Sequence, residues 1–451
     1  MVMTLHQKFM EERKMNSVLI AILIMVVLSL CKLNVILALF IGALAGGLIS
    51  GMGVTDVIGV FTGGIVNGAE IALSYALLGG FAALIAYSGI TDVMVDKILE
   101  LLKTSKTKKA RVLAKVSLII TLLIISMMSQ NLIPVHIAFI PILVPPLISL
   151  FNELELDRRL IAVVITFGLT FTYAVLPFGY GQIFQNTIVT SFQNAGVEIN
   201  FQDVAPNMII PALGFVVGLI LAVFYFRKPR KYLNKESDLA TSTVRVSKST
   251  ILTALVAIVV TFTVQFFTDS MIFGALGGIM IFFLSFRFKW SDLDVELVNG
   301  IKIMAYIGMV MLAANGFASV ITETGDVLPL VNSITDVLGD NKAFIVMGML
   351  IVGLVVTMGI GSSFATLPII AAIFVPMGAE LGLSMSAIIA IVGTAGVLGD
   401  AGSPASDSTL GPTAGLNVDG QHDHIWDTCV PTFIFLNIPV VITGFIAGMI
   451  L

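Results

Sequence analysis

One segment near the end of the chain combines acidic, hydroxyl and glycine residues inside an otherwise apolar region. It reads GDAGSPASDST, residues 399–409, and it follows the apolar run 387–398. The segment cannot remain helical through Pro404, because proline lacks an N–H and clashes with the preceding turn. Non-helical backbone at membrane depth must line a cavity or be buried in protein. The two acids of the segment, Asp400 and Asp407, are therefore candidates for function.

Two chemistries suit a carboxylate in such a place. An ionised aspartate at membrane depth costs about 2.5–3.5 kcal/mol on insertion scales, which makes a functional role the default interpretation. It can bind Na+ together with other hard oxygen ligands, or it can exchange a proton when burial desolvates it. We expect Asp400 and Asp407 to hold a transported Na+, with Ser403 and Ser406 beside them. The alternative is an aqueous loop in which Asp407 only caps the following helix.

Three other interruptions of apolar segments offer neutral polar groups. Two are predicted hairpin tips, MMSQNLIPVH at 127–136 and MGIGSSFATLP at 358–368, and the third is LPFGYGQ at 176–182, a break within a crossing like that at 399–409. Unwound backbone exposes carbonyls for cations and helix N-termini for anions, so transporters bind ligands at such places. The candidate binding residues at these interruptions are Ser129, Gln130, Asn131, His136, Gly179, Gln182, Ser362, Ser363 and Thr366.

These neutral groups also have purely structural interpretations. Hydroxyl and amide side chains at a turn can cap the neighbouring helices, and His136 can serve as a hydrogen-bond partner between helices. The interruption at 176–182 holds no acid and offers only Gln182, with Tyr173 and Tyr180 nearby. The predicted site is therefore asymmetric, as a polar organic substrate would require.

The elements that position these residues belong to a membrane protein. The chain is 57% hydrophobic and 12% charged, with a mean hydropathy of +1.03, and a chain of this size with a water-facing surface does not tolerate such values. A net charge of −4 and the lack of a basic face argue against nucleic acid as a partner. We expect a multi-pass protein of the cell inner membrane whose partner is the lipid bilayer.

Cysteine and histidine give no metal site by spacing. Cys31 and Cys429 lie far apart in or beside apolar segments, so we interpret both as packing residues rather than as a disulfide. His422, Asp423 and His424 form a short run without a third ligand at helical spacing. We interpret that run as a solvated loop and expect no bound cofactor.

The apolar segments form two successive sets, and a bilayer core needs about 20 helical residues to be crossed. The first set lies near 17–31, 34–51, 69–90, 111–129, 133–150, 160–192 and 205–226. The second lies near 249–268, 271–286, 300–322, 342–360, 364–382, 386–417 and 430–451. This predicts a tail at 1–16, a first repeat at 17–226, a cytoplasmic linker at 227–248 and a second repeat at 249–451.

Matched landmarks support a duplication. The pair Asn-Gly at 67–68 recurs at 299–300, and Gly-Phe-Ala at 80–82 recurs at 316–318. Seven segments per unit is an odd number, so the second unit enters the membrane from the opposite side. The expected fold is all-α and polytopic, with two inverted-topology repeats of about five crossings, a re-entrant hairpin and a broken helix each. Basic residues before the fourth segment, in the linker and after the ninth segment place those loops in the cytoplasm.

The sequence resembles the Na+/H+ antiporter family of the NhaC type, within the ion transporter superfamily. The resemblance is specific at GDAGSPASDSTLGPT, residues 399–413, and it extends to the paired tips and inverted halves. The nearest branch is the YuiF-like proteins, regarded as transporters of amino acids, histidine among them. The resemblance implies one central site built from tips and breaks, a transport domain that moves against a scaffold, and a homodimer. Members with carboxylate substrates carry Ser-Asn-Thr at the tips, and this chain has Ser129-Gln130-Asn131 and Ser362-Ser363-Phe364 instead.

We therefore expect a secondary active transporter of a small amino acid, coupled to H+ or Na+ by alternating access. The alternative within the same fold is Na+/H+ exchange, in which Asp400 or Asp407 alternates between cation and proton. A channel would need a continuous polar pore, which interrupted helices do not favour. The sequence contains no Walker motif, HExxH or GxSxG, so we do not expect an enzyme.

Overall fold

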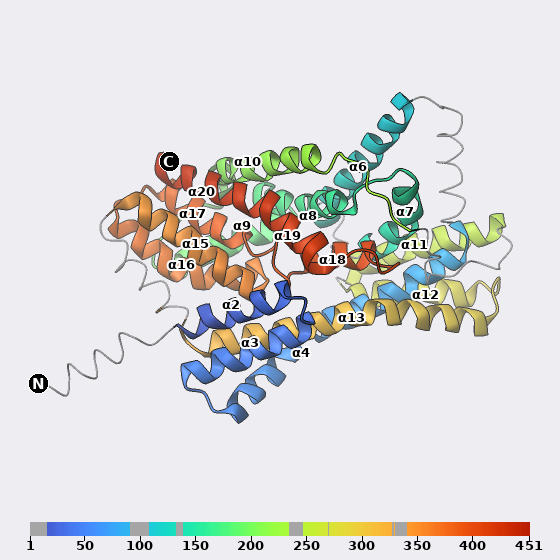
Figure 1. The fold of residues 1–451 in the computed structure, drawn as a ribbon, viewed down its shortest axis with the longest axis horizontal. Helices are drawn as coiled ribbons and strands as arrows, with labels where there is room; N and C mark the ends of the chain where they lie inside the picture. The colour runs from blue at the N-terminus through green and yellow to red at the C-terminus, as the bar shows by residue number, and fades with distance from the viewer. Residues whose placement is uncertain are drawn as a thin grey trace, which may run out of the picture.

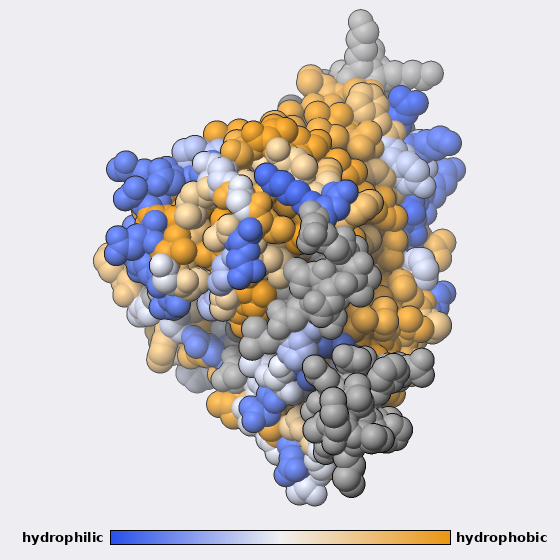
Figure 2. All heavy atoms as spheres, turned by 90° about the vertical axis from the view of Figure 1, so that its left-hand side faces the viewer, coloured by the Kyte–Doolittle hydropathy of each residue, from blue (hydrophilic) through white to orange (hydrophobic). Residues whose placement is uncertain are grey.

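The computed structural model describes residues 16–90, 108–131, 139–233, 247–268, 270–326, 329 and 341–451. Throughout these ranges the ordered elements are helices. Eight helices within the described ranges are long and apolar enough to cross a membrane. Large apolar side chains remain exposed along many of them, and Figure 2 shows a broad apolar surface over the upper part of the molecule, with hydrophilic residues at its left and right edges and in patches between them. The all-helical expectation is confirmed for the described chain.

The helices before the linker form the first set. They are α2 (Ser17–Leu30), α3 (Val35–Ser50), α4 (Val54–Tyr87), α6 (Lys108–Asn131), α7 (Phe139–Glu153), α8 (Arg158–Val175), α9 (Tyr180–Asn194) and α10 (Phe201–Tyr225).

The second set follows the linker and ends in one long composite helix. It contains α11 (Lys248–Thr268), α12 (Met271–Leu284), α13 (Trp290–Glu323), α15 (Lys342–Ile360), α16 (Ser363–Glu380), α17 (Met385–Val397), α18 (Asp407–Leu416), η2 (His424–Cys429), α19 (Val430–Thr432), η3 (Phe433–Asn437) and α20 (Ile438–Ile450).

Two predicted segments are longer in the structure. Helix α4 begins at Val54 rather than near 69, and α13 begins at Trp290 rather than near 300. Polar residues such as Asp56 and Asp294 lower the local hydropathy without interrupting the helix. A hydropathy window therefore misses the first turns, while the helix continues through them.

The two 34-residue helices α4 and α13 pack along each other in opposite directions (Figure 1). A Cβ at Gly68 would lie 2.9 Å from the carbonyl oxygen of Met311, and one at Gly79 would lie 2.6 Å from that of Gly300. As the residue number rises along one helix it falls along the other. The small residues allow this close approach of the two backbones.

Helices α10 and α20 form a second antiparallel pair of corresponding elements. The Thr443 hydroxyl donates to the Pro211 carbonyl at 2.9 Å, and a Cβ at Gly214 would lie 2.7 Å from the Pro439 carbonyl oxygen. Equivalent helices run antiparallel when the two-fold axis relating them is perpendicular to their length. Inverted repeats predict this arrangement. We propose the repeat relationship and the domain boundaries on that basis.

Other contacts between elements occur in matched pairs. Helix α2 packs on α3 as α11 packs on α12, and α7 packs on α18 as α16 packs on α9. In this correspondence, the helix after each tip contacts the helix after the break of the other half. Such crossed contacts join each half of the chain to the interrupted segment of the other half.

The linker, the α7–α8 loop and the start of η2 lie at the same end of the molecule. Arg230 donates its backbone N–H to the Glu155 carbonyl at 3.2 Å and its guanidinium to Asp427 at 2.9 Å. Leu233 and Gln421 exchange two hydrogen bonds, at 2.8 and 2.7 Å. The predicted topology places all three segments on one side of the membrane, and these contacts agree with it.

Candidate functional site

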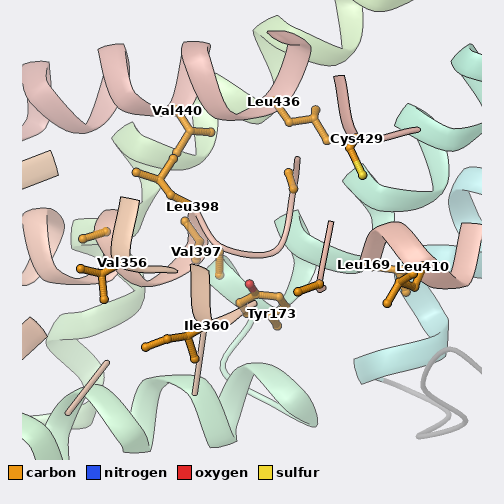
Figure 3. Close-up of a cluster of buried hydrophobic side chains, with 14 of the residues drawn as sticks. Leu169, Tyr173, Val356, Ile360, Val397, Leu398, Leu410, Cys429, Leu436 and Val440 are labelled. Atoms are coloured by element: carbon orange, nitrogen blue, oxygen red, sulfur yellow. The ribbon is translucent and has the colours of Figure 1, made fainter. Parts of the chain in front are cut away.

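The break predicted at 399–409 is present and is almost entirely buried. Helix α17 ends at Val397 and α18 begins at Asp407, so the intervening residues 398–406 leave the helical path. We call this segment the second break. Its residues are buried in the protein, and Asp407, which directly follows it, is half-buried. Apolar side chains from α8, α15, α17 and α18, together with η2, η3 and α20, surround it, with Tyr173 in their midst (Figure 3).

Side chains from the last helix hold the backbone of the second break. Asn437 donates to the Ala401 carbonyl at 2.5 Å, and the Thr432 hydroxyl accepts the Gly402 N–H at 3.1 Å. Both side chains come from the part of the last helix that contains the π-helical turns η2 and η3. Pro431 and Pro439 lack the N–H that a regular helix requires, which favours wider turns there.

The second break also contacts the predicted tip at 358–368. Helix α15 ends at Ile360, Gly361 adopts a left-handed φ of 71°, and α16 begins at Ser363. A Cβ at Gly361 would lie 2.8 Å from the Ala405 carbonyl oxygen, so only glycine fits this approach and this conformation. The Ser403 hydroxyl donates to the Met358 carbonyl at 2.7 Å.

The Asp400 carboxylate lies where the second break, the tip and α8 meet. The Tyr173 hydroxyl donates a short hydrogen bond to it. Ser363 adds hydrogen bonds from its hydroxyl and its backbone, and the Ser363 and Tyr173 oxygens are 3.1 Å apart. Asp400 is 8% exposed, and in the described chain no lysine, arginine or histidine pairs with it.

Asp407 stands at the other end of the same segment, as the first residue of α18. It interacts electrostatically with Asp400, Tyr173 and Tyr75. The hypothesis that Asp407 caps α18 is wrong, because Ser406 is the N-cap and its hydroxyl accepts the Ser408 N–H at 3.2 Å. The two acids therefore stay available for a role other than capping.

The structure assigns supporting roles to other predicted residues. Thr366 donates to the Ser362 carbonyl at 3.0 Å within its own helix. The interruption at 176–182 is real, since α8 ends at Val175 and α9 begins at Tyr180. Gly179 there has a φ of 60°, and the Gln182 side chain is exposed.

The first tip is only partly described. Ser129 is buried near the end of α6, and its hydroxyl donates to the Ser126 carbonyl at 2.8 Å. Gln130 and Asn131 belong to the last turn of the same helix. His136 lies outside the described residues. No hydrogen bond in the described chain joins Ser129 to Asp400.

Two predictions about histidine and cysteine residues fail. His422 and His424 are buried, at 2% and 8% exposure, so the expectation of a solvated loop is wrong for the two histidines, while Asp423 between them is exposed. Cys31 is exposed rather than packed, whereas Cys429 is buried as expected. The loop turns inward because its polar groups find partners inside the protein, which hydropathy along the chain does not reveal.

The two histidines form the ends of a buried hydrogen-bonded chain. His422 Nε2 lies 2.7 Å from the Thr428 hydroxyl, which lies 2.9 Å from the Thr413 hydroxyl. The Thr413 hydroxyl lies 2.8 Å from His424 Nδ1, and His424 Nε2 donates to the Pro404 carbonyl at 3.0 Å. Among the described residues, groups of three or more histidine, cysteine or acidic side chains that could hold a metal are absent.

Arg158 and Asp419 form a fully enclosed ion pair near the linker. The guanidinium donates to the two carboxylate oxygens at 2.6 and 2.5 Å, and also to the Leu416 carbonyl and the Asn152 side chain. Burial alone would raise the pKa of Asp419, but the hydrogen bonds and charge of Arg158 outweigh burial and lower it. Asp157 and Asp427 bind Arg230 of the linker beside this pair.

Comparison with known proteins assigns the family. A profile described as "Na+/H+ antiporter family" matches residues 164–447, and a second, "Na+-H+ antiporter family", matches 16–102. The chain belongs to the Na+/H+ antiporter family. It is a multi-pass membrane protein of a transporter family.

Full-length relatives are similar over nearly the whole chain. A Bacillus subtilis protein named "Putative amino acid transporter YuiF" is 51% identical over 443 residues, which cover 97% of this chain and 100% of the relative. An uncharacterized membrane protein of Vibrio parahaemolyticus is 48% identical, with 97% and 100% covered. The solved Alcanivorax borkumensis YdaH transporter is 14% identical, with a TM-score of 0.42 and 88% of each chain covered.

Tyr173 is the functional candidate that sequence reasoning left out of the site. It was visible as a polar aromatic residue at the end of an apolar helix, but its relation to Asp400, 227 positions away, was not. Thr432 and Asn437 were equally hidden, because they belong to a segment that looks uniformly apolar.

Proposed function

We propose that this protein is a secondary active transporter of a small amino acid, coupled to H+ or Na+ by alternating access. The observation that carries the proposal is the buried Asp400 carboxylate, which Tyr173 and Ser363 hydrogen-bond and which no basic side chain neutralises in the described chain. An uncompensated buried charge is costly, so this position favours binding of a cation or a proton. The name of the Bacillus subtilis relative supports an amino acid as substrate.

Coupling follows from the position of the carboxylate. Asp400 contacts the tip through Ser363 and α8 through Tyr173, so a change at the carboxylate acts on both elements. Asp407 adds a second negative charge to the same site. A bound cation relieves the repulsion between the two acids, and the occupied site can then change its exposure to the two sides. The Asn437 Oδ1 atom is buried and has no hydrogen-bond partner among the described residues, so it is a further hard oxygen beside the second break.

The second candidate function is Na+/H+ exchange without an organic substrate. The family description favours it, and Asp400 would alternate between Na+ and a proton. In both cases Na+ or H+ is the transported coupling ion, and the protein needs no bound cofactor. We also propose that the protein forms a homodimer in the cell inner membrane.

The experiment is uptake by purified protein in proteoliposomes. Radiolabelled amino acids are offered under separately imposed Na+ and H+ gradients, and empty liposomes serve as the control. Accumulation of an amino acid under one gradient supports the proposal and names the coupling ion. Gradient-driven Na+ and H+ exchange with no accumulation of any amino acid would support the second candidate instead.

A further inference from the structure

The structure contains a cavity of about 400 Å³ that is distinct from the Asp400 site. Asp400, Tyr173 and Ser363 are not among the residues that line it. Its walls come from the α2–α3 turn, α13, the end of α18 and the start of η2. A cavity of this size fits a small organic molecule. It lies at the linker end of the molecule, because Arg230 binds Asp427 within the same short helix that lines it.

The cavity wall carries one positive and one negative side chain. Lys32 comes from the α2–α3 turn, and Asp423 is the N-cap of η2. The Asp423 carboxylate accepts the Trp426 N–H at 2.7 Å through Oδ1, which fixes its orientation. Lys32 and Asp423 form no ion pair with each other in the described chain, and each is exposed. Both charges can therefore meet the charged groups of a ligand.

The remaining wall is partly aromatic and partly polar. Tyr306 and Trp426 contribute rings, and Leu33 and Ile425 contribute aliphatic side chains. The Ser29 hydroxyl, on a residue that is 1% exposed, also lines the cavity and has no hydrogen-bond partner in the described structure. An unpartnered buried hydroxyl is costly unless a ligand or water satisfies it.

The backbone at Lys32 supports a role for this side chain. Lys32 has a left-handed φ of 65°, and Leu33 donates to the Leu28 carbonyl at 3.0 Å, so Lys32 occupies the position after a helix end where glycine is preferred. A side chain in this conformation costs about 1–2 kcal/mol. A lysine here thus carries a conformational cost while it lines the cavity.

The cavity also reaches the second break through one shared side chain. His424 lines the cavity, and its Nε2 donates to the Pro404 carbonyl within the break at 3.0 Å. Thr413 lines the cavity as well and hydrogen-bonds the other nitrogen of the same ring. A ligand in the cavity would therefore contact the residues that support the segment carrying Asp400.

We propose that this cavity binds a free α-amino acid in its zwitterionic form, with the carboxylate facing Lys32, the ammonium facing Asp423 and the side chain against Tyr306 and Trp426. This proposal rests on the proposed function and names the place where the substrate enters on the linker side. One cation and one anion select a dipolar ligand over a simple anion or cation. The aromatic rings favour an apolar or planar side chain and also attract an ammonium group.

The test uses Trp426 as a reporter within the cavity. The chain has two tryptophans, Trp290 and Trp426, so Trp290→Phe leaves Trp426 as the only tryptophan, which is excited selectively over tyrosine. The purified full-length protein in nanodiscs is titrated with L-histidine, L-leucine and L-glutamate, and with the N-acetyl and amide forms of leucine. We expect a saturable change in emission with a free amino acid, and binding at least tenfold weaker for its N-acetyl and amide forms.

Two variants assign the charges to the two ends of the ligand. Lys32→Met should weaken binding of the free amino acid at least tenfold. It should also abolish the preference for the free amino acid over its amide, which lacks the carboxylate. Asp423→Asn should abolish the preference over the N-acetyl form, and asparagine still caps the helix, so folding is retained. Lys228→Met removes an exposed lysine of the linker and should leave every affinity unchanged.

The outcomes separate this proposal from the proposed function. Suppose that proteoliposomes accumulate an amino acid but Trp426 does not respond, or that Lys32→Met and Asp423→Asn leave the response unchanged. Either result overturns the proposed binding site in the cavity and leaves the proposed transport function standing. Absence of accumulation and of binding for the whole panel overturns both. Binding with the expected pattern in both variants supports the cavity.

Discussion

Two buried aspartates show how this protein separates stability from function. Asp419 is bound on both oxygens by Arg158, which is 0% exposed and also binds a carbonyl and an amide. Asp400 is equally enclosed, yet its partners are the neutral hydroxyls of Tyr173 and Ser363. A carboxylate that already has its cation is fixed in place. A carboxylate that has only neutral donors can gain and release one.

The surroundings of the two acids follow the same division. Asp419 joins the end of α18 to the start of α8 through Arg158, and Asp427 binds Arg230 of the linker in the same region. Asp400 lies on a backbone segment that is held by side chains from the last helix and approached closely by the tip at Gly361. The region of Asp419 therefore links segments by ion pairs. The region of Asp400 instead holds the second break between the last helix and the tip at Gly361.

The largest expected effect is on stability at the paired aspartate. Arg158→Met leaves the Asp419 carboxylate buried and uncompensated, which should destabilise the protein by about 3–5 kcal/mol. Thermal unfolding of the purified protein in detergent measures it. The double variant Arg158→Met, Asp419→Leu should regain most of this loss, and a double variant as unstable as the single one would contradict the comparison.

The second effect is on coupling at the unpaired aspartate. Asp400→Asn keeps the size and hydrogen bonding of the side chain but removes its charge, so gradient-driven accumulation should fall at least 100-fold in proteoliposomes. The melting temperature should stay close to that of the unaltered protein, unlike that of Arg158→Met. Asp400→Glu should keep partial activity with a changed pH optimum. Wild-type accumulation by both Asp400→Asn and Asp407→Asn would show that these acids are structural.

A smaller effect is expected at the hydroxyl that binds Asp400. Tyr173→Phe removes a hydrogen bond to a charged group, worth about 1.5–3 kcal/mol, so accumulation should fall about 10- to 100-fold. Tyr232→Phe is the matched control, because its hydroxyl accepts the Arg158 N–H at the linker and lies away from Asp400. Equal losses of transport in the two variants would argue against a specific role of Tyr173.

The effect that is smallest at neutral pH concerns His422, in the region of Asp419, and it grows as the pH falls. Burial lowers the pKa of His422 to about 3, with weaker effects from Asp427, Arg158, His424 and Arg230. The unfolded chain has an ordinary histidine pKa near 6.5 and takes up a proton first. Stability should therefore fall as the pH drops from about 6.5 toward 3, and His422→Asn should flatten the slope. An unchanged slope in denaturation curves would show that His422 is not the group responsible.

The sequence determined the class of this protein and the location of its chemistry. Composition alone predicted a membrane protein. Pro404 and the polar cluster around it predicted the break, because a proline and several small polar residues cannot continue an apolar helix in lipid. The duplication could be inferred from matched landmarks, and the antiparallel packing of α4 with α13 agrees with it.

Only the tertiary structure decided which acids have partners. The local pattern singled out Asp400, but nothing along the chain shows that Arg158 binds Asp419 from 261 positions away while Asp400 has the hydroxyl of Tyr173 as its partner. The inward turn of His422 and His424 and the approach of Tyr173 were hidden for the same reason. Hydropathy and helix-breaking residues act over a few neighbouring positions, whereas ion pairs and buried hydrogen bonds join segments that only packing brings together.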